Sequence, residues 1–101
     1  MNSFVYRILL PDEWDDFKRK KVFHGNDLDK KSGYIHLSEK KQLEKTINIY
    51  FQKKKVVILK IDTERVKEKL LWETSRGGEK FPHLYDRLTL ESVVKVDRVD
   101  A

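Results

Sequence analysis

The chain has 101 residues, of which 39% are hydrophobic and 39% charged, and it carries a formal net charge of +5 with no cysteine. This length fits one domain over residues 1–101 with a single core, and the lack of cysteine excludes disulfides and thiolate metal sites. The first apolar segment is short and contains Arg7, and no apolar run reaches membrane-spanning length, so we expect a cytoplasmic protein without a signal peptide or a membrane partner.

Polarity patterns predict strands and helices along the whole chain. In order, they are a strand at 4–9, a helix after Pro11, a strand at 34–37, a helix from Ser38 to about Phe51, a strand at 55–61, a helix within 62–70, and strands at 70–73, 83–88 and 92–99. Residues 24–33 are rich in Gly, Asn and Asp and predict turns. The most apolar strand, 55–61, is expected at the centre of the sheet. This order favours an α+β fold, with a curved, mostly antiparallel, split sheet and about three helices packed on it.

Each predicted helix has a start signal or an apolar face. Pro11 suits a first helical turn, where its missing N–H would have no partner. Ser38 is a suitable N-cap for the second helix. The third helix should bury Val66 and Leu70, and Trp72 in the following strand is expected in the core.

Positive charge is concentrated between residues 18 and 55, which carry a net charge of +8, whereas the rest of the chain carries −3. A basic surface of this kind can attract RNA or another polyanion. Aromatic residues do not interleave the lysine runs, as a platform for stacked bases would require. We therefore favour solvated helix ends and loops, and keep RNA binding through 18–55 as an alternative.

A first candidate site lies in the segment GYIHLS. In a strand Tyr34, His36 and Ser38 share one face, and the amides of a helix that begins at Ser38 would favour an anion. These side chains would form a ligand surface. The alternative is that His36 packs half-buried against the sheet and Ser38 only caps a helix.

A second candidate site is the segment RGGEKFPHLYDRL at 76–88. Arg76 and the two glycines beside it can bring a guanidinium and backbone amides close to a phosphate. Glu73 stands at a strand end, and His83 and Tyr85 face the same side of their strand. Two strands that each carry a histidine beside a hydroxyl group argue for one shared cleft. The alternative is a structural glycine turn with a buried Pro–His pair.

Two other chemistries have weaker support. His24, His36 and His83 lie on separate elements without the spacing of metal ligands. No nucleophile-elbow sequence surrounds Ser38. We therefore expect neither a metal centre nor a serine-hydrolase triad.

Motifs along nearly the whole chain carry a family resemblance. They are YRIL, FHGNDLD, GYIHLS, VVILKID, LLWE and RGGEKFPHLY. With these motifs the chain resembles the bacterial family called domain of unknown function 952, and IHLS together with FPHLY is the specific part. The fold of that family is thought similar to the ADP-ribosyltransferase superfamily, in which a split, curved sheet holds NAD in its central cleft.

The resemblance implies a ligand and residues that bind it. In that superfamily a histidine on an early strand, followed by a hydroxyl residue, grips the NAD ribose, which implies His36 and Ser38 here. A tyrosine stacks on nicotinamide, which implies Tyr50 or Tyr85. NAD or another nucleotide is then the expected ligand.

The resemblance also implies a set of catalytic residues. The transferases of the superfamily usually end with a glutamate on a late strand, and His83 stands at that place here, with Glu73 nearby. RNA 2′-phosphotransferases of the same superfamily work without that glutamate and rely on Arg and His residues, which adds Arg76. The implied activity is ADP-ribosyl or phosphoryl transfer, and the alternative is a non-catalytic module that binds a nucleotide or RNA.

Overall fold

Antiparallel sheets and three α-helices build the fold in the computed structural model, which describes residues 3–100 apart from the side chain of Arg76. The helices are α1 (Pro11–Lys20), α2 (Asp27–Ser32) and α3 (Leu43–Tyr50). The strands are β1 (Phe4–Leu9), β2 (Val22–Phe23), β3 (Ile35–His36), β4 (Lys55–Asp62), β5 (Leu70–Thr74), β6 (Lys80–Leu84), β7 (Leu88–Thr89) and β8 (Val93–Asp100). The α+β class expected from the sequence is confirmed.

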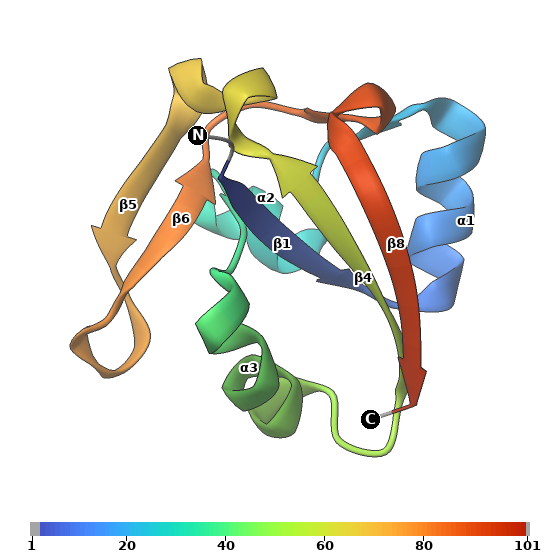
Figure 1. Cartoon of the computed structure of the whole chain (residues 1–101), viewed down its shortest axis with the longest axis horizontal. Coiled ribbons are helices and arrows are strands. Elements are labelled where there is room, and N and C mark those ends of the chain that lie inside the picture. The colour runs from blue at the N-terminus through green and yellow to red at the C-terminus, as the bar shows by residue number, and fades with distance from the viewer. Residues whose placement is uncertain (1–2, 101) are drawn as a thin grey trace.

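The segment predicted to be the central strand forms β4, which lies between β1 and β8 in a three-stranded sheet. Figure 1 shows this sheet with α1 on one side and the β5–β6 pair on the other. Four side chains of β4 are at most 1% exposed: Val56, Val57, Leu59 and Ile61. Burial of so many β-branched and aliphatic side chains explains why this segment is the most apolar of the chain.

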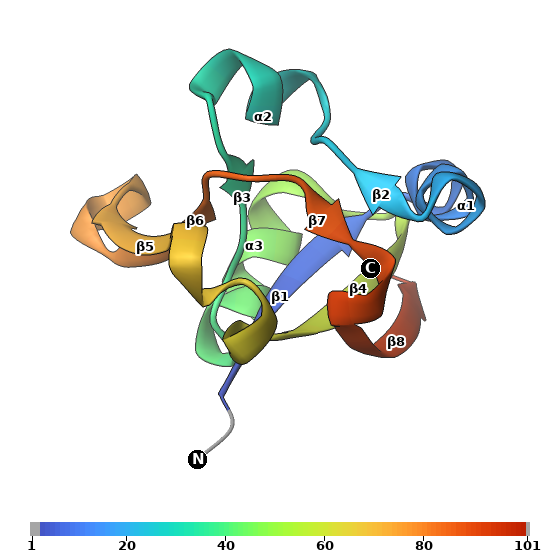
Figure 2. The same ribbon diagram turned by 90° about the horizontal axis from the view of Figure 1, so that it is seen from above.

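A second three-stranded sheet has the order β3-β6-β5. A single bridge between Tyr6 and Ser38 joins this sheet to β1, with backbone hydrogen bonds of 2.8 Å in both directions. The two sheets therefore meet at this bridge, between β1 and the residues that follow β3 (Figure 2). This junction brings α2, α3, β3 and β6 to a common region beside β1.

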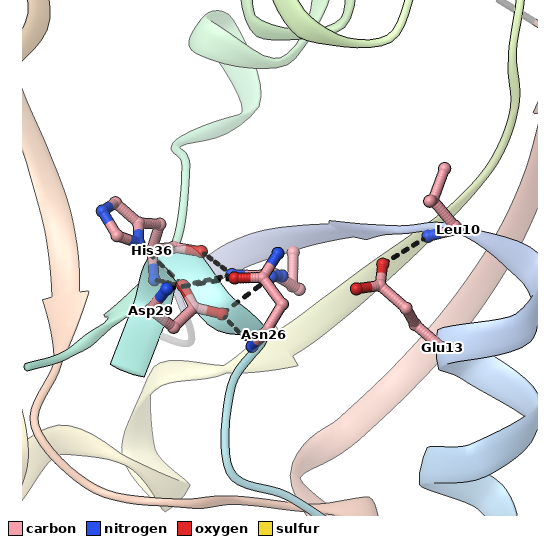
Figure 3. Close-up of polar contacts among 6 residues, drawn as sticks. Leu10, Glu13, Asn26, Asp29 and His36 are labelled. Atoms are coloured by element: carbon pink, nitrogen blue, oxygen red, sulfur yellow. Dashed lines mark hydrogen bonds and ion pairs between the residues drawn. The ribbon is translucent and has the colours of Figure 1, made fainter. Parts of the chain in front are cut away.

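Helix α1 begins at Pro11, as its sequence predicts. The carboxylate of Glu13 accepts a hydrogen bond of 2.8 Å from the N–H of Leu10 at the helix start (Figure 3). The helix buries Trp14 and Phe17, whose rings meet edge to face at 5.5 Å. Phe17 also stacks on Phe23 of β2 at 5.8 Å. Aromatic packing thus fixes α1 and β2 to one end of the core.

The prediction of turns throughout 24–33 was wrong for α2. Asn26 and Asp29 cap this helix reciprocally, because Asn26 Oδ1 accepts from the N–H of Asp29 and Asp29 Oδ2 accepts from the N–H of Asn26. Gly33 ends the helix with φ of 88°, a conformation that glycine adopts without strain. The short strand β2, which pairs with β7, was also missed.

The predicted N-cap at Ser38 was wrong as well. The backbone of Ser38 pairs with Tyr6, and the cap of the following 3₁₀ turn (Lys40–Gln42), which leads into α3, is Glu39. Strand pairing therefore continues two residues beyond β3. Ser38 is buried beside β1 and is not at a helix start.

Residues 62–70 form two 3₁₀ turns, Thr63–Arg65 and Lys67–Lys69, in place of the predicted helix. Leu70 is buried as the first residue of β5. Trp72, expected in the core, is 43% exposed because β5 is an edge strand of its sheet.

The basic residues between 18 and 55 are all exposed, as solvated helix ends and loops would be. On α1 they form ion pairs with neighbouring acids, including Lys18 with Asp15 and Lys20 with Asp16. No helix within residues 3–100 combines the length and the apolar character that a bilayer crossing requires.

Candidate functional site

A cavity of about 280 Å³ opens where α2, α3, β3 and β6 meet beside β1. Its lining combines aromatic and aliphatic side chains with a group of polar ones: Arg7, Asp29, His36, Ser38, Tyr50 and His83. An apolar wall with a few convergent polar groups is typical of a small-molecule site.

The register of β3 and β6 brings two histidines to one face. His36 pairs directly with His83 across the two strands, so their side chains leave the sheet on the same side. Their ring centroids are 6.0 Å apart, with the ring planes at 62°. Both side chains line the cavity.

Asp29 is a buried carboxylate with five protein donors around it (Figure 3). The two terminal nitrogens of Arg7 bind its two oxygens at 2.9 Å each. The N–H of Asn26 donates at 2.7 Å and the N–H of His36 at 3.0 Å. Burial alone would raise the pKa of Asp29, but the hydrogen bond from His36 and the charge of Arg7 outweigh it and hold that pKa well below its usual range. Asp29 is therefore ionised at neutral pH.

The carboxylate of Asp29 fixes the orientation of His36. Nδ1 of His36 lies 2.7 Å from Asp29 Oδ1. Because an ionised carboxylate can only accept, Nδ1 carries the proton in this contact, and Nε2 is the nitrogen that remains for a ligand. In Figure 3 the ring of His36 extends away from Asp29. The side chain of His36 is 32% exposed.

His83 has a carboxylate partner of its own. Nδ1 of His83 lies 2.9 Å from Glu73 Oε1, and the hydroxyl of Tyr85 donates to the same oxygen at 2.5 Å. The hydrogen bonds from Tyr85 and then His83 lower the pKa of Glu73. His83 is only 3% exposed, and its buried Nε2 has no hydrogen-bond partner among the residues that the structure describes.

Tyr34 is the centre of a ring cluster between the two histidines. Its ring stacks on His83 at 3.9 Å with 20° between the planes, and it contacts His36 at 4.6 Å. Tyr85 lies 5.4 Å away on the same side. Tyr34 therefore limits how far either imidazole can turn.

The paired glycines that follow β5 form a left-handed turn. Gly77 and Gly78 have φ of 66° and 78°, which favours glycine over any other residue. A backbone hydrogen bond of 2.8 Å from Ser75 N–H to the carbonyl oxygen of Glu79 closes the turn and leads the chain into β6. The predicted role of the Arg76 side chain falls outside the part of the chain that the structure describes.

The structure brings most of the sequence-predicted residues together. His36, Ser38, Tyr50 and His83 line the cavity. Glu73 and Tyr85 lie behind His83 and contact it or each other. Sequence reasoning missed two further residues at the site, Arg7 and Asp29. It placed Tyr34 on the same strand face as His36 but did not predict its stacking on His83.

Two weak signals could have found Arg7 and Asp29. Arg7 is a lone charge in an apolar strand, and it is 5% exposed in the structure. Asp29 follows Asn26 by three residues, the spacing of a reciprocal helix cap. A buried charge requires a partner, so Arg7 indicated an acid nearby, while the cap spacing indicated a helix that includes Asp29.

Comparison with known families decides where this chain belongs. Residues 8–96 match the model of the family described as protein of unknown function (DUF952). The chain belongs to this family. The X-ray structure of protein CC0527 from Caulobacter crescentus has a TM-score of 0.91 and 37% identity, over 97% of this chain and 87% of that one. The solution NMR structure of CC0527 has a TM-score of 0.86 and 38% identity, over 96% and 84%. No curated protein matches the chain.

In this DUF952 chain the phenol of Tyr85 should ionise late. Its hydrogen bond to Glu73 favours the neutral phenol and raises the pKa of Tyr85 to about 12. Absorbance at the tyrosinate band should therefore rise equally in the wild type and in Tyr85→Phe between about pH 9 and 11, where ordinary tyrosines ionise. Glu73→Gln should let Tyr85 ionise in the same pH range, so the rise in tyrosinate absorbance should be larger than in the wild type. If Tyr85→Phe instead removes a quarter of the rise, as one of four tyrosines would, the hydrogen bond does not hold in solution.

Proposed function

We propose that this chain binds a nucleotide with an NAD-like ribose and phosphate in the cavity, and that it acts on this ligand as an ADP-ribosyl or phosphoryl transferase. One observation carries the proposal: two histidines, each bound at Nδ1 by a carboxylate, line the same cavity. A carboxylate behind an imidazole fixes its tautomer and supports a positive charge on it, as proton transfer requires.

The size and lining of the cavity fit part of such a ligand. Its volume of about 280 Å³ is just below the usual range for small-molecule sites, so it suits a nucleoside-sized group, with the rest of a dinucleotide outside. The hydroxyl of Ser38 and the imidazole of His36 suit ribose hydroxyls. The rings of Tyr50, Phe51 and Phe81 suit a base or a nicotinamide.

The resemblance to the ADP-ribosyltransferase superfamily supports the same ligand. The element IHLS matches the histidine and hydroxyl pair that grips the NAD ribose there, and both residues line the cavity here. His83 stands where those transferases usually carry a glutamate. A site that holds a second histidine at this place favours a reaction in which that group moves a proton.

Thermal denaturation with NAD, ADP-ribose and AMP tests the proposal. At a hundredfold excess over its Kd a ligand stabilises the folded state by about 2.7 kcal/mol, which in a domain of this size raises Tm by roughly 10 °C. His36→Ala should reduce the shift and His24→Ala, at an exposed position, should retain it. If none of these nucleotides raises the Tm of the wild type, the proposal fails. The alternative is that residues 18–55 bind RNA. RNA binding that is retained in His36→Ala and that weakens steeply with salt would support it.

A further inference from the structure

We infer that His36 and His83 act as a base and an acid on a phosphodiester whose ribose carries a free 2′-hydroxyl group. The inference rests on the proposed function, since the ribose must lie in the cavity, and it selects phosphoryl transfer over ADP-ribosyl transfer. The substrate class is a ribonucleoside 3′-phosphodiester. The reaction is attack of the 2′-oxygen on the adjacent phosphorus.

The placement of the two imidazoles fits proton transfer at two oxygens of one phosphoryl group. Both rings leave paired positions of β3 and β6, and their centroids are 6.0 Å apart. Each Nδ1 is occupied by a carboxylate, Asp29 for His36 and Glu73 for His83, so each ring has only Nε2 for a substrate. We take this separation to fit one phosphoryl group between the rings, and proton transfer then requires each Nε2 to come within about 2.6–3.2 Å of its oxygen.

Exposure distinguishes the two roles. His36 is 32% exposed and lines the cavity with Ser38, so it is the group that meets a ribose hydroxyl and accepts the 2′-proton. His83 is 3% exposed, and its Nε2 is buried without a partner among the described residues. A buried nitrogen without a partner is unfavourable, and the leaving oxygen of a substrate would satisfy it as its bond to phosphorus breaks. His83 is therefore the proton donor to the leaving group.

The reaction is balanced without a further reactant. The 2′-hydroxyl gives its proton to Nε2 of His36 as the bond from the 2′-oxygen to phosphorus forms. The bond from phosphorus to the leaving oxygen breaks, and that oxygen takes the proton from Nε2 of His83. The products are a 2′,3′-cyclic phosphate and an alcohol, and solvent returns the two histidines to their starting protonation states. Asp29 and Glu73 stabilise the positive charge that each imidazole carries in turn.

The need for an acid separates this reaction from transfer of ADP-ribose. Nicotinamide leaves NAD as a neutral molecule, so its departure requires no proton, and a second oriented imidazole would have no part in that step. A phosphodiester releases an oxygen that would be an alkoxide unless it is protonated. Two imidazoles, each held by its own carboxylate, therefore match the phosphodiester reaction.

Cleavage of a dinucleotide tests the inference. Adenylyl-(3′→5′)-adenosine is incubated with the wild type and with His36→Gln, His83→Gln and His24→Gln, all purified in the same way, and products are separated by chromatography. We expect adenosine 2′,3′-cyclic phosphate and adenosine from the wild type and from His24→Gln. Each of the other two variants should be slower by about 10²- to 10⁴-fold, the usual contribution of one acid or base. The analogue with a 2′-deoxy first residue should bind and remain intact.

Each other outcome overturns the inference. Cleavage of the deoxy analogue would show that the 2′-oxygen does not attack. Equal cleavage by all four proteins would show that the histidines take no part. No cleavage of a dinucleotide that raises Tm would overturn the inference and leave nucleotide binding in place, whereas no cleavage and no Tm shift with any nucleotide would overturn both.

Discussion

Replacing Asp29 with alanine should lower the free energy of unfolding by about 3–5 kcal/mol, the usual cost of removing one partner of a buried ion pair. Arg7 would keep its charge at 5% exposure without the carboxylate that binds its two terminal nitrogens. The backbone N–H groups of Asn26 and His36 would also lose their acceptor. Urea denaturation measures this as a lower midpoint with an unchanged slope.

Two control variants sharpen this prediction. Asp16→Ala removes an acid that pairs with Lys20 on the exposed face of α1, and it should leave the midpoint nearly unchanged, since exposed ion pairs contribute little. Adding Arg7→Met to Asp29→Ala should recover part of the loss because no buried charge is then unpaired. If Asp29→Ala and Asp16→Ala had equally small effects, the buried ion pair would not support the fold.

His83→Ala should lower turnover of the dinucleotide by about 10²- to 10⁴-fold and leave its Kd within a few-fold. The reason is that His83 meets the leaving oxygen only as its bond to phosphorus breaks, so the contact is made mainly in the transition state. His36→Ala should lower turnover and also weaken binding, because His36 contacts the ribose hydroxyl before reaction begins. Single-turnover kinetics and calorimetry measure the two effects separately.

A purely structural role for these histidines predicts a different pattern. Both variants would then lose Tm equally, and any loss of activity would follow the loss of folded protein. The Tm of each variant is therefore measured beside its Kd, with His24→Ala as the control at an exposed position. Equal destabilisation with no selective effect on ligand or turnover would mean that the histidines only pack.

The parts of the fold that follow from local signals were predictable. β1, α1 and β4 lie where alternation, a proline at the helix start and a long apolar run place them. Two of the predictions that failed depend on contacts far along the chain. Ser38 has the chemistry of a helix cap, but pairing with Tyr6 extends the strand through it. Trp72 is apolar, but its strand lies at an edge of the sheet, which no local pattern reveals.

The candidate site also has a part that local sequence signals predict and a part that depends on distant contacts. Strand alternation placed His36 with Tyr34 and Ser38, and His83 with Tyr85, on common faces. The pairing of β3 with β6, which sets the two histidines opposite each other, is not encoded in either strand alone. Asp29, the partner of His36, was missed because it lies on a helix that was predicted as turns. Arg7, which also binds Asp29, is 22 residues away from it in sequence.

A nucleotide should bind in the cavity beside His36 and His83. Long-range ¹H–¹⁵N NMR spectra resolve the imidazole nitrogens of each histidine, and the chain has only three histidines. Titration with ADP-ribose should shift the Nε2 signals of His36 and His83 in a saturable way and leave those of the exposed His24 unchanged. If saturating ADP-ribose leaves His36 and His83 unshifted, or shifts His24 alone, no nucleotide binds in this cavity.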